Sequence, residues 1–174
     1  MKNVYQLSYS NGSMTQCNVG ERERSEKMRL FIDGDASPVK NEVIEVARKN
    51  ELEVIIVTSI DHFTTKEYPE HVSFHYVDKG NDMADYRIVA LISSGDLLIT
   101  QDYGLASLVL PKARVLHHNG WEYTQNNIDV LLMRRYHSAE MRKAGHRTKG
   151  PSAFSQEQRK IFQSKLEQTV SEAN

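Results

Sequence analysis

The chain has 174 residues with 22 basic and 23 acidic side chains, so its formal net charge is −1. This balance excludes a protein whose whole surface is basic, and any contact with nucleic acid would need a local basic patch. No apolar run approaches the roughly 20 residues of a membrane span, and the N-terminus lacks the apolar core of a secretory signal. Because the single cysteine, Cys17, has no partner for an internal disulfide, we expect a cytoplasmic protein without membrane contact.

Residues 1–27 differ in composition from the rest of the chain. Polar and small residues over 5–17 are followed by a run of mixed charge over 21–27, and neither stretch has an apolar face at a period of 2 or 3.6. Such a segment buries too little apolar surface to offset the entropy lost on ordering. We therefore predict a disordered tail over 1–27, with a partner-binding arm as the alternative, and a globular domain over 28–174.

From residue 28 onward, short apolar runs alternate with stretches of helical periodicity, a pattern that predicts an α/β domain. The sheet should be mostly parallel and covered by helices on both faces, which gives three layers. After residue 123 the pattern becomes wholly helical and predicts a C-terminal helical extension. The expected strands are 30–32, 54–57, 72–77, 97–100 and 114–117. The expected helices are 38–49, 82–92, 103–110, one beginning after 124 and one beginning after 155.

The starts of these helices carry residues that are typical of N-caps. Ser37 precedes a proline, Asp82 precedes an apolar stripe, and Thr124 precedes the first of the two C-terminal helices. Ser155 and Gln158 have the spacing of a capping box, in which each side chain bonds the other residue's backbone N–H.

Five aspartates follow the predicted strands along the chain. In an open parallel sheet, ligands bind beyond the carboxyl ends of the strands, so we expect these side chains to converge on one edge. Carboxylates that crowd together repel one another, and their hard oxygen atoms suit Mg²⁺ or Mn²⁺. The five candidate catalytic residues and metal ligands are Asp33, Asp35, Asp82, Asp85 and Asp102.

Three of these acids also have a purely structural explanation. Asp82 and Asp85 fall at the N-cap and N3 positions of a predicted helix, where acids satisfy free N–H groups, and Asp102 would cap the following helix in the same way. Asp33 and Asp35 are harder to explain structurally, because acids at the end of a buried strand are costly without a partner.

A basic stretch follows these acids. Residues 134–149 carry a net charge of +5, which suits phosphate contacts, although a solvated helix face is the alternative. Arg142, Arg147 and Lys149 are candidate phosphate ligands within it. Lys40 lies in the first turn of a predicted helix, from which it could also reach a phosphate.

Four separated motifs carry a family resemblance: Asp33-Gly-Asp-Ala-Ser-Pro-Val-Lys40, residues 80–85, residues 95–102 and residues 147–152. Together they resemble the bacterial YaiI/YqxD family, which is similar to PIN-like nuclease domains, and the resemblance covers 28 to about 168. It implies a PIN-like fold and a metal site, and the Thr100-x-Asp102 element is similar to one that follows the fourth strand of a PIN sheet. Where the family has Asp-Ala-Asp-Ala-Cys-Pro, this chain has Gly34 and Ser37, so a thiol mechanism does not fit.

The leading hypothesis is a Mg²⁺- or Mn²⁺-dependent, PIN-like nuclease acting on RNA. The five aspartates would hold the metal and orient water. The substrate would contact Ser37, Lys40, Thr100, Arg142, Arg147 and Lys149. Two alternatives remain. One is a phosphatase of the haloacid-dehalogenase type, because Asp33-x-Asp35-x-Ser37 resembles its nucleophile motif. The other is a module that binds nucleic acid or protein without turnover.

Overall fold

The protein is described from a computed structural model, in residues 6–10, 13–17, 27–35, 37–80, 82–143 and 153–173. Its centre is a six-stranded sheet in the order β5-β4-β3-β6-β7-β8, in which every neighbouring pair is parallel except β7 and β8. The strands are β3 (Arg29–Asp33), β4 (Glu53–Ser59), β5 (Val72–Val77), β6 (Leu97–Ile99), β7 (Arg114–Leu116) and β8 (Glu122–Tyr123).

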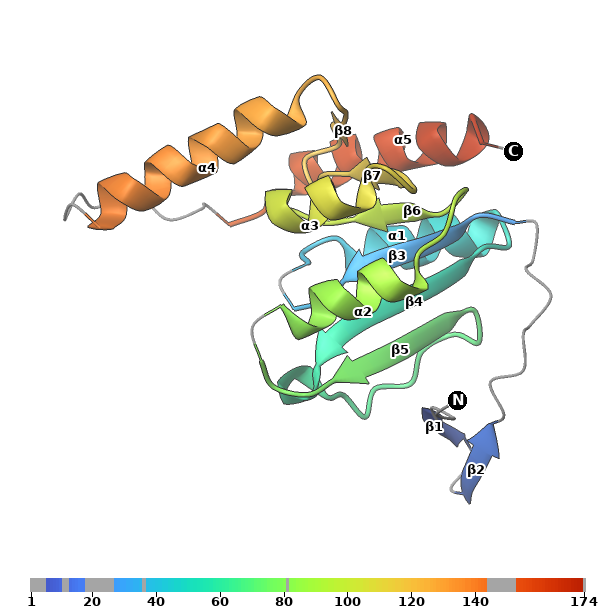
Figure 1. The fold of residues 1–174 in the computed structure, drawn as a ribbon. Coiled ribbons are helices and arrows are strands. Elements are labelled where there is room, and N and C mark those ends of the chain that lie inside the picture. Colours follow the sequence, from blue (N-terminus) through green and yellow to red (C-terminus); the bar gives the residue numbers. More distant parts are fainter. Residues whose placement is uncertain are drawn as a thin grey trace.

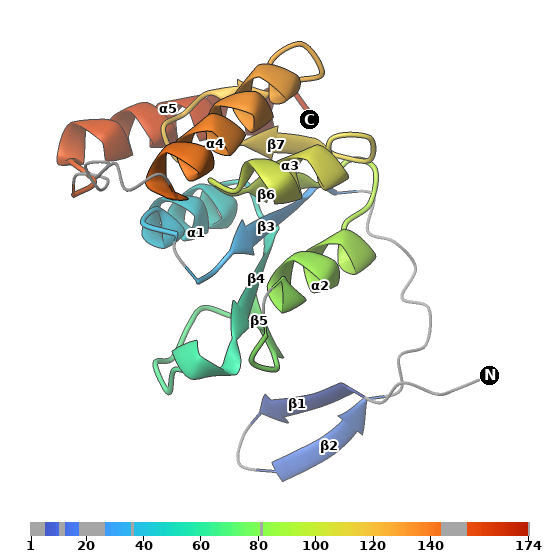
Figure 2. The same ribbon diagram turned by 60° about the vertical axis from the view of Figure 1, so that its left-hand side comes forward.

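Helices cover both faces of this sheet (Figures 1 and 2). On one face, α1 and α5 pack over the strands; on the other lie α2, α3 and the first turns of α4. The bounds are α1 (Lys40–Lys49), α2 (Met83–Leu91), α3 (Tyr103–Val109), α4 (Ile128–Lys143) and α5 (Gln156–Ser171), and a short 3₁₀ helix, η1 (Ile60–His62), follows β4. The prediction of a single α/β domain with a mostly parallel sheet is confirmed.

Alternate residues of the central strand divide the core into two halves. Leu30 and Ile32 of β3 point into the cluster under α1 and α5, whereas Phe31 points into the cluster under α2 and α3, and all three are fully buried. This burial on both faces explains why β3 and β4 have continuous apolar runs rather than alternating ones. Because β3 pairs in parallel with β4 and β6, the carboxyl ends of these three strands lie at one edge of the sheet.

Strand β8 was not predicted from the sequence. The chain turns back at Gly120, which has a positive φ of 80°, and His117 and Trp121 are joined by a backbone hydrogen bond. Glu122 and Tyr123 then pair with β7 in the antiparallel direction. A strand of two residues is too short to show alternation in the sequence, so the sheet is mixed rather than wholly parallel.

Three predicted N-caps are wrong in their details. Val39, not Ser37, is the N-cap residue of α1, and the carbonyl oxygen of Pro38 accepts a hydrogen bond from Arg159 of α5. Asp82 does occupy the N-cap position of α2, but its φ of 63° is left-handed and its side chain makes no capping bond. Thr124 precedes α4 by a turn, and the helix begins at Ile128.

Near the N-terminus, β1 (Gln6–Ser10) and β2 (Ser13–Cys17) pair with each other in a separate two-stranded sheet. The sequence did not predict these strands, because the segment shows no apolar alternation. A lone hairpin is marginally stable. The prediction of a disordered tail over 1–27 stays a prediction. Among the described helices, none combines the length and the apolar character needed to cross a membrane.

Candidate active site at the carboxyl edge of the sheet

The candidate site is built where the three central strands end. Asp33 is the last residue of β3, Thr58 and Ser59 end β4, and Thr100 directly follows β6. Asp102 comes two residues later as the N-cap of α3. Parallel pairing therefore brings to one edge residues that lie almost 70 positions apart in the sequence.

Thr100 links two of the carboxylates. Its side chain is fully buried, and its hydroxyl donates a hydrogen bond to Oδ2 of Asp33 over 2.9 Å. The hydroxyl oxygen of Thr100 in turn accepts a hydrogen bond from the backbone N–H of Asp102 over 3.0 Å. Thr100 was predicted to bind substrate. Its fully buried hydroxyl, which bonds groups of both Asp33 and Asp102, suits a role in positioning these acids, and substrate contact by Thr100 stays a prediction.

Asp35 is held by the neighbouring strand. Its Oδ1 accepts hydrogen bonds from the Thr58 hydroxyl over 2.6 Å and from the Ser59 backbone N–H over 2.8 Å. The residue is otherwise exposed. Gly34 permits this arrangement, since its N–H bonds the Val57 carbonyl over 2.7 Å and a Cβ there would lie only 2.8 Å from that oxygen. After β3 ends, the backbone at Gly34 therefore lies in close contact with β4.

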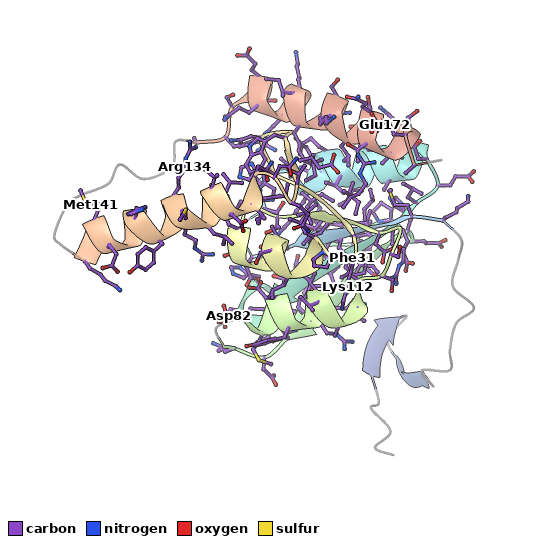
Figure 3. The ribbon with its side chains drawn as sticks, turned by 45° about the horizontal axis from the view of Figure 1, so that its top comes forward. Phe31, Asp82, Lys112, Arg134, Met141 and Glu172 are labelled. Carbon is purple, nitrogen blue, oxygen red and sulfur yellow. The ribbon has the colours of Figure 1, made fainter. Side chains whose placement is uncertain are left out.

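The aspartates lie near enough to raise one another's pKa. Burial raises the pKa of Asp33, with Asp35 and Asp102 adding to the effect, while the hydrogen bond from Thr100 opposes it. The pKa of Asp85, near the start of α2, is raised to about 6 by burial and then by Asp33, Asp102 and Asp82. Figure 3 labels Asp82 at the start of α2, on the side from which α4 projects. The predicted convergence of the five aspartates on one edge thus agrees with their placement.

Two cationic side chains lie beside these acids. Nη1 of Arg135 in α4 is 2.8 Å from Oδ1 of Asp102. Lys40, in the first turn of α1, has its pKa lowered by burial, and the nearby Asp35 and Asp33 oppose that shift. The Oδ1 atom of Asp102 also accepts the backbone N–H groups of Gly104 and Leu105, so the predicted cap of α3 is present. Asp102 therefore both caps a helix and faces the site.

The carboxylates do not form a closed metal cage. Within the part of the chain that the structure describes, no three His, Cys, Asp or Glu side chains are grouped closely enough to hold one metal ion. Hard carboxylate oxygens are nevertheless the donors that Mg²⁺ and Mn²⁺ prefer, and such ions keep several water ligands. The donor chemistry fits the predicted ion, and the metal site stays a prediction.

The structure places the other predicted substrate-binding residues in different positions. Lys40 lies at the site. The Ser37 hydroxyl is buried and has no hydrogen-bond partner among the described residues, so nothing links it to a substrate. The side chain of Arg142, together with Arg147 and Lys149, lies outside the described residues. Of the basic stretch, the described side chains include Arg134 and Arg135, both exposed.

The sequence did not predict the contacts that Arg135 and Thr58 make, nor an aromatic wall beside Asp102. Arg135 stands four residues after Leu131, on the side of α4 that meets the domain, and this spacing was the available signal. In the wall, His117 stacks on Trp121 with ring centroids 4.4 Å apart, and Tyr103 lies 6.5 Å from His117. All three rings are half-buried.

Comparison with known proteins places the chain in a family. A family model described as "Uncharacterized BCR, YaiI/YqxD family" matches residues 31–172. The chain belongs to the YaiI/YqxD family. The match contains every strand of the six-stranded sheet except the first residues of β3, and it contains all five aspartates.

Curated relatives of this YaiI/YqxD protein match nearly over their full length. A UPF0178 protein of Enterococcus faecalis is 59% identical over 144 residues, which is 82% of this chain and 97% of the relative. Relatives from Oceanobacillus iheyensis (52% over 136 residues; 78% and 93%) and Staphylococcus saprophyticus (53% over 137 residues; 78% and 89%) are similar. No solved structure matches the chain significantly.

Proposed function

We propose that this YaiI/YqxD protein is a divalent-metal-dependent nuclease, PIN-like in its chemistry, that cleaves single-stranded RNA at the carboxyl edge of the sheet. The observation that carries the proposal is the excess of carboxylate at this edge. Asp33 is largely withdrawn from water and faces Asp35, Asp85 and Asp102, and its direct side-chain partner is a neutral hydroxyl, Thr100. A buried anion with anionic neighbours is costly unless a cation joins it.

A divalent cation fits this edge. Asp33, Asp85 and Asp102 would hold it, with Asp35 and Asp82 on the rim and water completing the coordination. When bound, such an ion activates water and offsets negative charge on a phosphoryl group. The pKa values of Asp33 and Asp85 are raised because burial and neighbouring carboxylates disfavour their charged forms, and a bound cation would relieve this repulsion.

The remaining groups of the edge suit a nucleic-acid chain. Lys40 and Arg135 approach the carboxylates from opposite faces of the sheet and would contact the phosphates that flank the scissile bond. The half-buried rings of Tyr103, His117 and Trp121 form a wall on which an unpaired base could stack, which favours a single strand over a duplex. Thr100 keeps Asp33 and Asp102 in register throughout.

Cleavage of labelled oligonucleotides tests the proposal. Single-stranded RNA, duplex RNA and single-stranded DNA of one sequence are incubated with the protein in Mg²⁺, in Mn²⁺ or in EDTA. We expect metal-dependent cleavage of single-stranded RNA, and a loss of at least about 100-fold in Asp33→Asn, roughly 3 kcal/mol of barrier. Asp129→Asn is the matched control, because Asp129 is an exposed acid in the first turn of α4 and outside the site.

Other outcomes decide against the nuclease. Metal-dependent RNA binding without cleavage would show a non-catalytic binding module. Release of phosphate from small phosphoesters, with a phosphoryl group trapped on Asp33, would show a phosphatase of the haloacid-dehalogenase type. Cleavage that Asp33→Asn leaves unchanged would show a contaminating nuclease.

A further inference from the structure

The aromatic wall of Tyr103, His117 and Trp121 is packed in place beside Asp102. The backbone N–H of His117 bonds the Trp121 carbonyl over 2.8 Å, and Tyr103 follows Asp102 in the first turn of α3. Behind the wall, Tyr123 is 2% exposed, and its ring centroid lies 4.6 Å from that of Trp121, 5.9 Å from that of His117 and 6.0 Å from that of Tyr103. The three wall rings keep part of their surface in water. A flat ligand could therefore stack on them without first ordering these side chains.

The polar atoms of the wall are hydrogen-bond donors. Nδ1 of His117 accepts the backbone N–H of Asn119 over 3.0 Å, so the ring proton lies on Nε2. Burial lowers the pKa of His117 to about 4, so this ring is neutral at pH 7. Nε1 of Trp121 is a donor only, and the Tyr103 hydroxyl donates as well. None of these three donor atoms has a hydrogen-bond partner among the described residues, and none is sealed from water as the Tyr123 hydroxyl is.

We propose that this wall binds one unpaired nucleobase and selects keto bases, uracil and guanine, over amino bases, cytosine and adenine. The proposal rests on the proposed function, which supplies single-stranded RNA as the ligand, and it adds which bases the protein recognises. Uracil and guanine carry a carbonyl oxygen at the edge position where cytosine and adenine carry an amino group. Because the wall lies beside Asp102, its preference would decide which nucleotide is placed next to the carboxylates.

Stacking and hydrogen bonding contribute differently to this selection. Every base has a π-face, so stacking on aromatic rings supplies affinity with little preference. A carbonyl oxygen accepts a hydrogen bond from the donors of the wall, whereas an amino group meets them donor to donor. Both groups then lose water without gaining a bond, and this loss disfavours the amino base. The donor character of the wall is thus the observation that selects the keto bases.

Nuclear magnetic resonance of the full-length protein tests the proposal with nucleosides, which contain no phosphodiester bond to cleave. Trp121 is the single tryptophan of the chain, so its indole N–H gives a single cross-peak in a ¹⁵N correlation spectrum. Uridine is compared with cytidine, and inosine with adenosine, because the members of each pair have the same ring system and differ at the keto or amino position. We expect uridine and inosine to shift this peak with millimolar dissociation constants, about fivefold below those of cytidine and adenosine.

His117→Phe separates the donor from the ring. The variant keeps a flat ring for stacking but has no Nε2–H, so the preference within each pair should fall to about twofold or less while the keto nucleosides still bind. Tyr103→Phe removes a second donor and should lower the preference in the same direction, so a folding defect in one variant does not decide the test. His62→Phe is the matched control, because His62 is exposed on η1, which follows β4, three strands from β7 in the sheet. The control should keep the parent's preference.

Equal affinities within both pairs would overturn the proposal, as would a Trp121 peak that no nucleoside moves at up to about 20 mM. A parental preference that survives in both His117→Phe and Tyr103→Phe would also contradict it. The nuclease is judged separately. Cleavage of RNA by a protein without the keto preference would remove this inference and leave the proposed function, whereas keto selection without cleavage would support this inference and count against the nuclease.

Discussion

Thr100 is the residue on which the geometry of the carboxyl edge depends. Its hydroxyl donates to Asp33 and accepts from the backbone of Asp102, so one buried side chain fixes the spacing of two acids that come from different elements. The sequence showed Thr100 only as part of a motif, since which group a hydroxyl contacts depends on the neighbouring strand. Its positioning role came from the structure.

Thr100→Val should therefore destabilise the protein. The substitution keeps the shape of the side chain but leaves the buried Asp33 carboxylate without its side-chain donor, a loss of about 1–3 kcal/mol in the free energy of unfolding. Thr169→Val is the matched control, because Thr169 is fully buried and its hydroxyl has no partner among the described residues. Urea denaturation at pH 7 compares the two. Equal effects of the two substitutions would contradict the role of Thr100.

Asp85 makes the stability of the metal-free protein depend on pH. Because its pKa rises from 3.8 to about 6 on folding, the unfolded chain loses this proton at a lower pH than the folded protein does. The free energy of unfolding therefore falls as the pH rises from about 4 to about 6. Asp85→Asn removes this fall. At pH 7 in EDTA the variant should be about 1 kcal/mol more stable, a value reduced for the partial exposure of the side chain.

Thermal melts of the parent and Asp85→Asn from pH 4 to pH 8 measure this difference. The two curves should converge at the acidic end, where the parent's carboxyl group is protonated in both states. A constant difference at every pH would show that the substitution acts through packing and not through charge.

At the scale of elements, the sequence predicted helix caps correctly where the bonded residues lie only a few positions apart. The capping box of α5 is present as predicted: the Ser155 hydroxyl accepts the N–H of Gln158, and the Gln158 side chain accepts the N–H of Ser155. The same reasoning failed at Ser37, because the start of α1 is set by α5, whose Arg159 binds both the Pro38 carbonyl and Glu42. A contact between residues more than 100 positions apart leaves no local signal.

Ser155→Ala should consequently cost about 1 kcal/mol of stability, because it leaves N–H groups at the start of α5 without a partner. Helix α5 contributes Phe162, Leu166 and Val170 to the core, so the loss should appear in global unfolding. Ser37→Ala is the control, since the Ser37 hydroxyl makes no capping bond. Denaturant unfolding measures the loss of stability in both variants, and we expect the larger loss in Ser155→Ala. A larger loss in Ser37→Ala would contradict the assignment of the caps.

At the scale of the whole molecule, the buried acids at the two edges of the sheet have different partners. At the amino edge, Asp96 is 4% exposed but fully compensated: it binds Nε and Nη2 of Arg29 and accepts the backbone N–H of Ser93. At the carboxyl edge, Asp33 faces other carboxylates. This contrast between a paired acid and crowded acids supports the proposal that the carboxyl edge is the functional one.

The sequence predicted this edge because parallel pairing follows from apolar runs that alternate with helices, although it did not predict the strand order. It did not predict what the acids contact. Arg135 reaches Asp102 across 33 positions, and Asp35 meets Thr58 through the pairing of β3 with β4. Strand β8 and the reversal at Gly120 were missed for a similar reason, since two residues are too few for a periodic signal. The sequence therefore predicted the parallel direction of the strands but not the partners of individual side chains.

The most direct test of the central claim is Mn²⁺ binding, followed by calorimetry and by the melting temperature of the metal-free protein. If the carboxyl edge holds a divalent ion, saturating Mn²⁺ should raise the melting temperature by roughly 5–10 °C, since binding to the folded state alone adds about 2.7 kcal/mol at 100 times the dissociation constant. Asp33→Asn should abolish the rise, and Asp129→Asn should keep it. A parent that neither binds Mn²⁺ nor gains stability, or an Asp33→Asn variant that gains as much as the parent, would contradict the assignment of this edge as a metal-dependent active site.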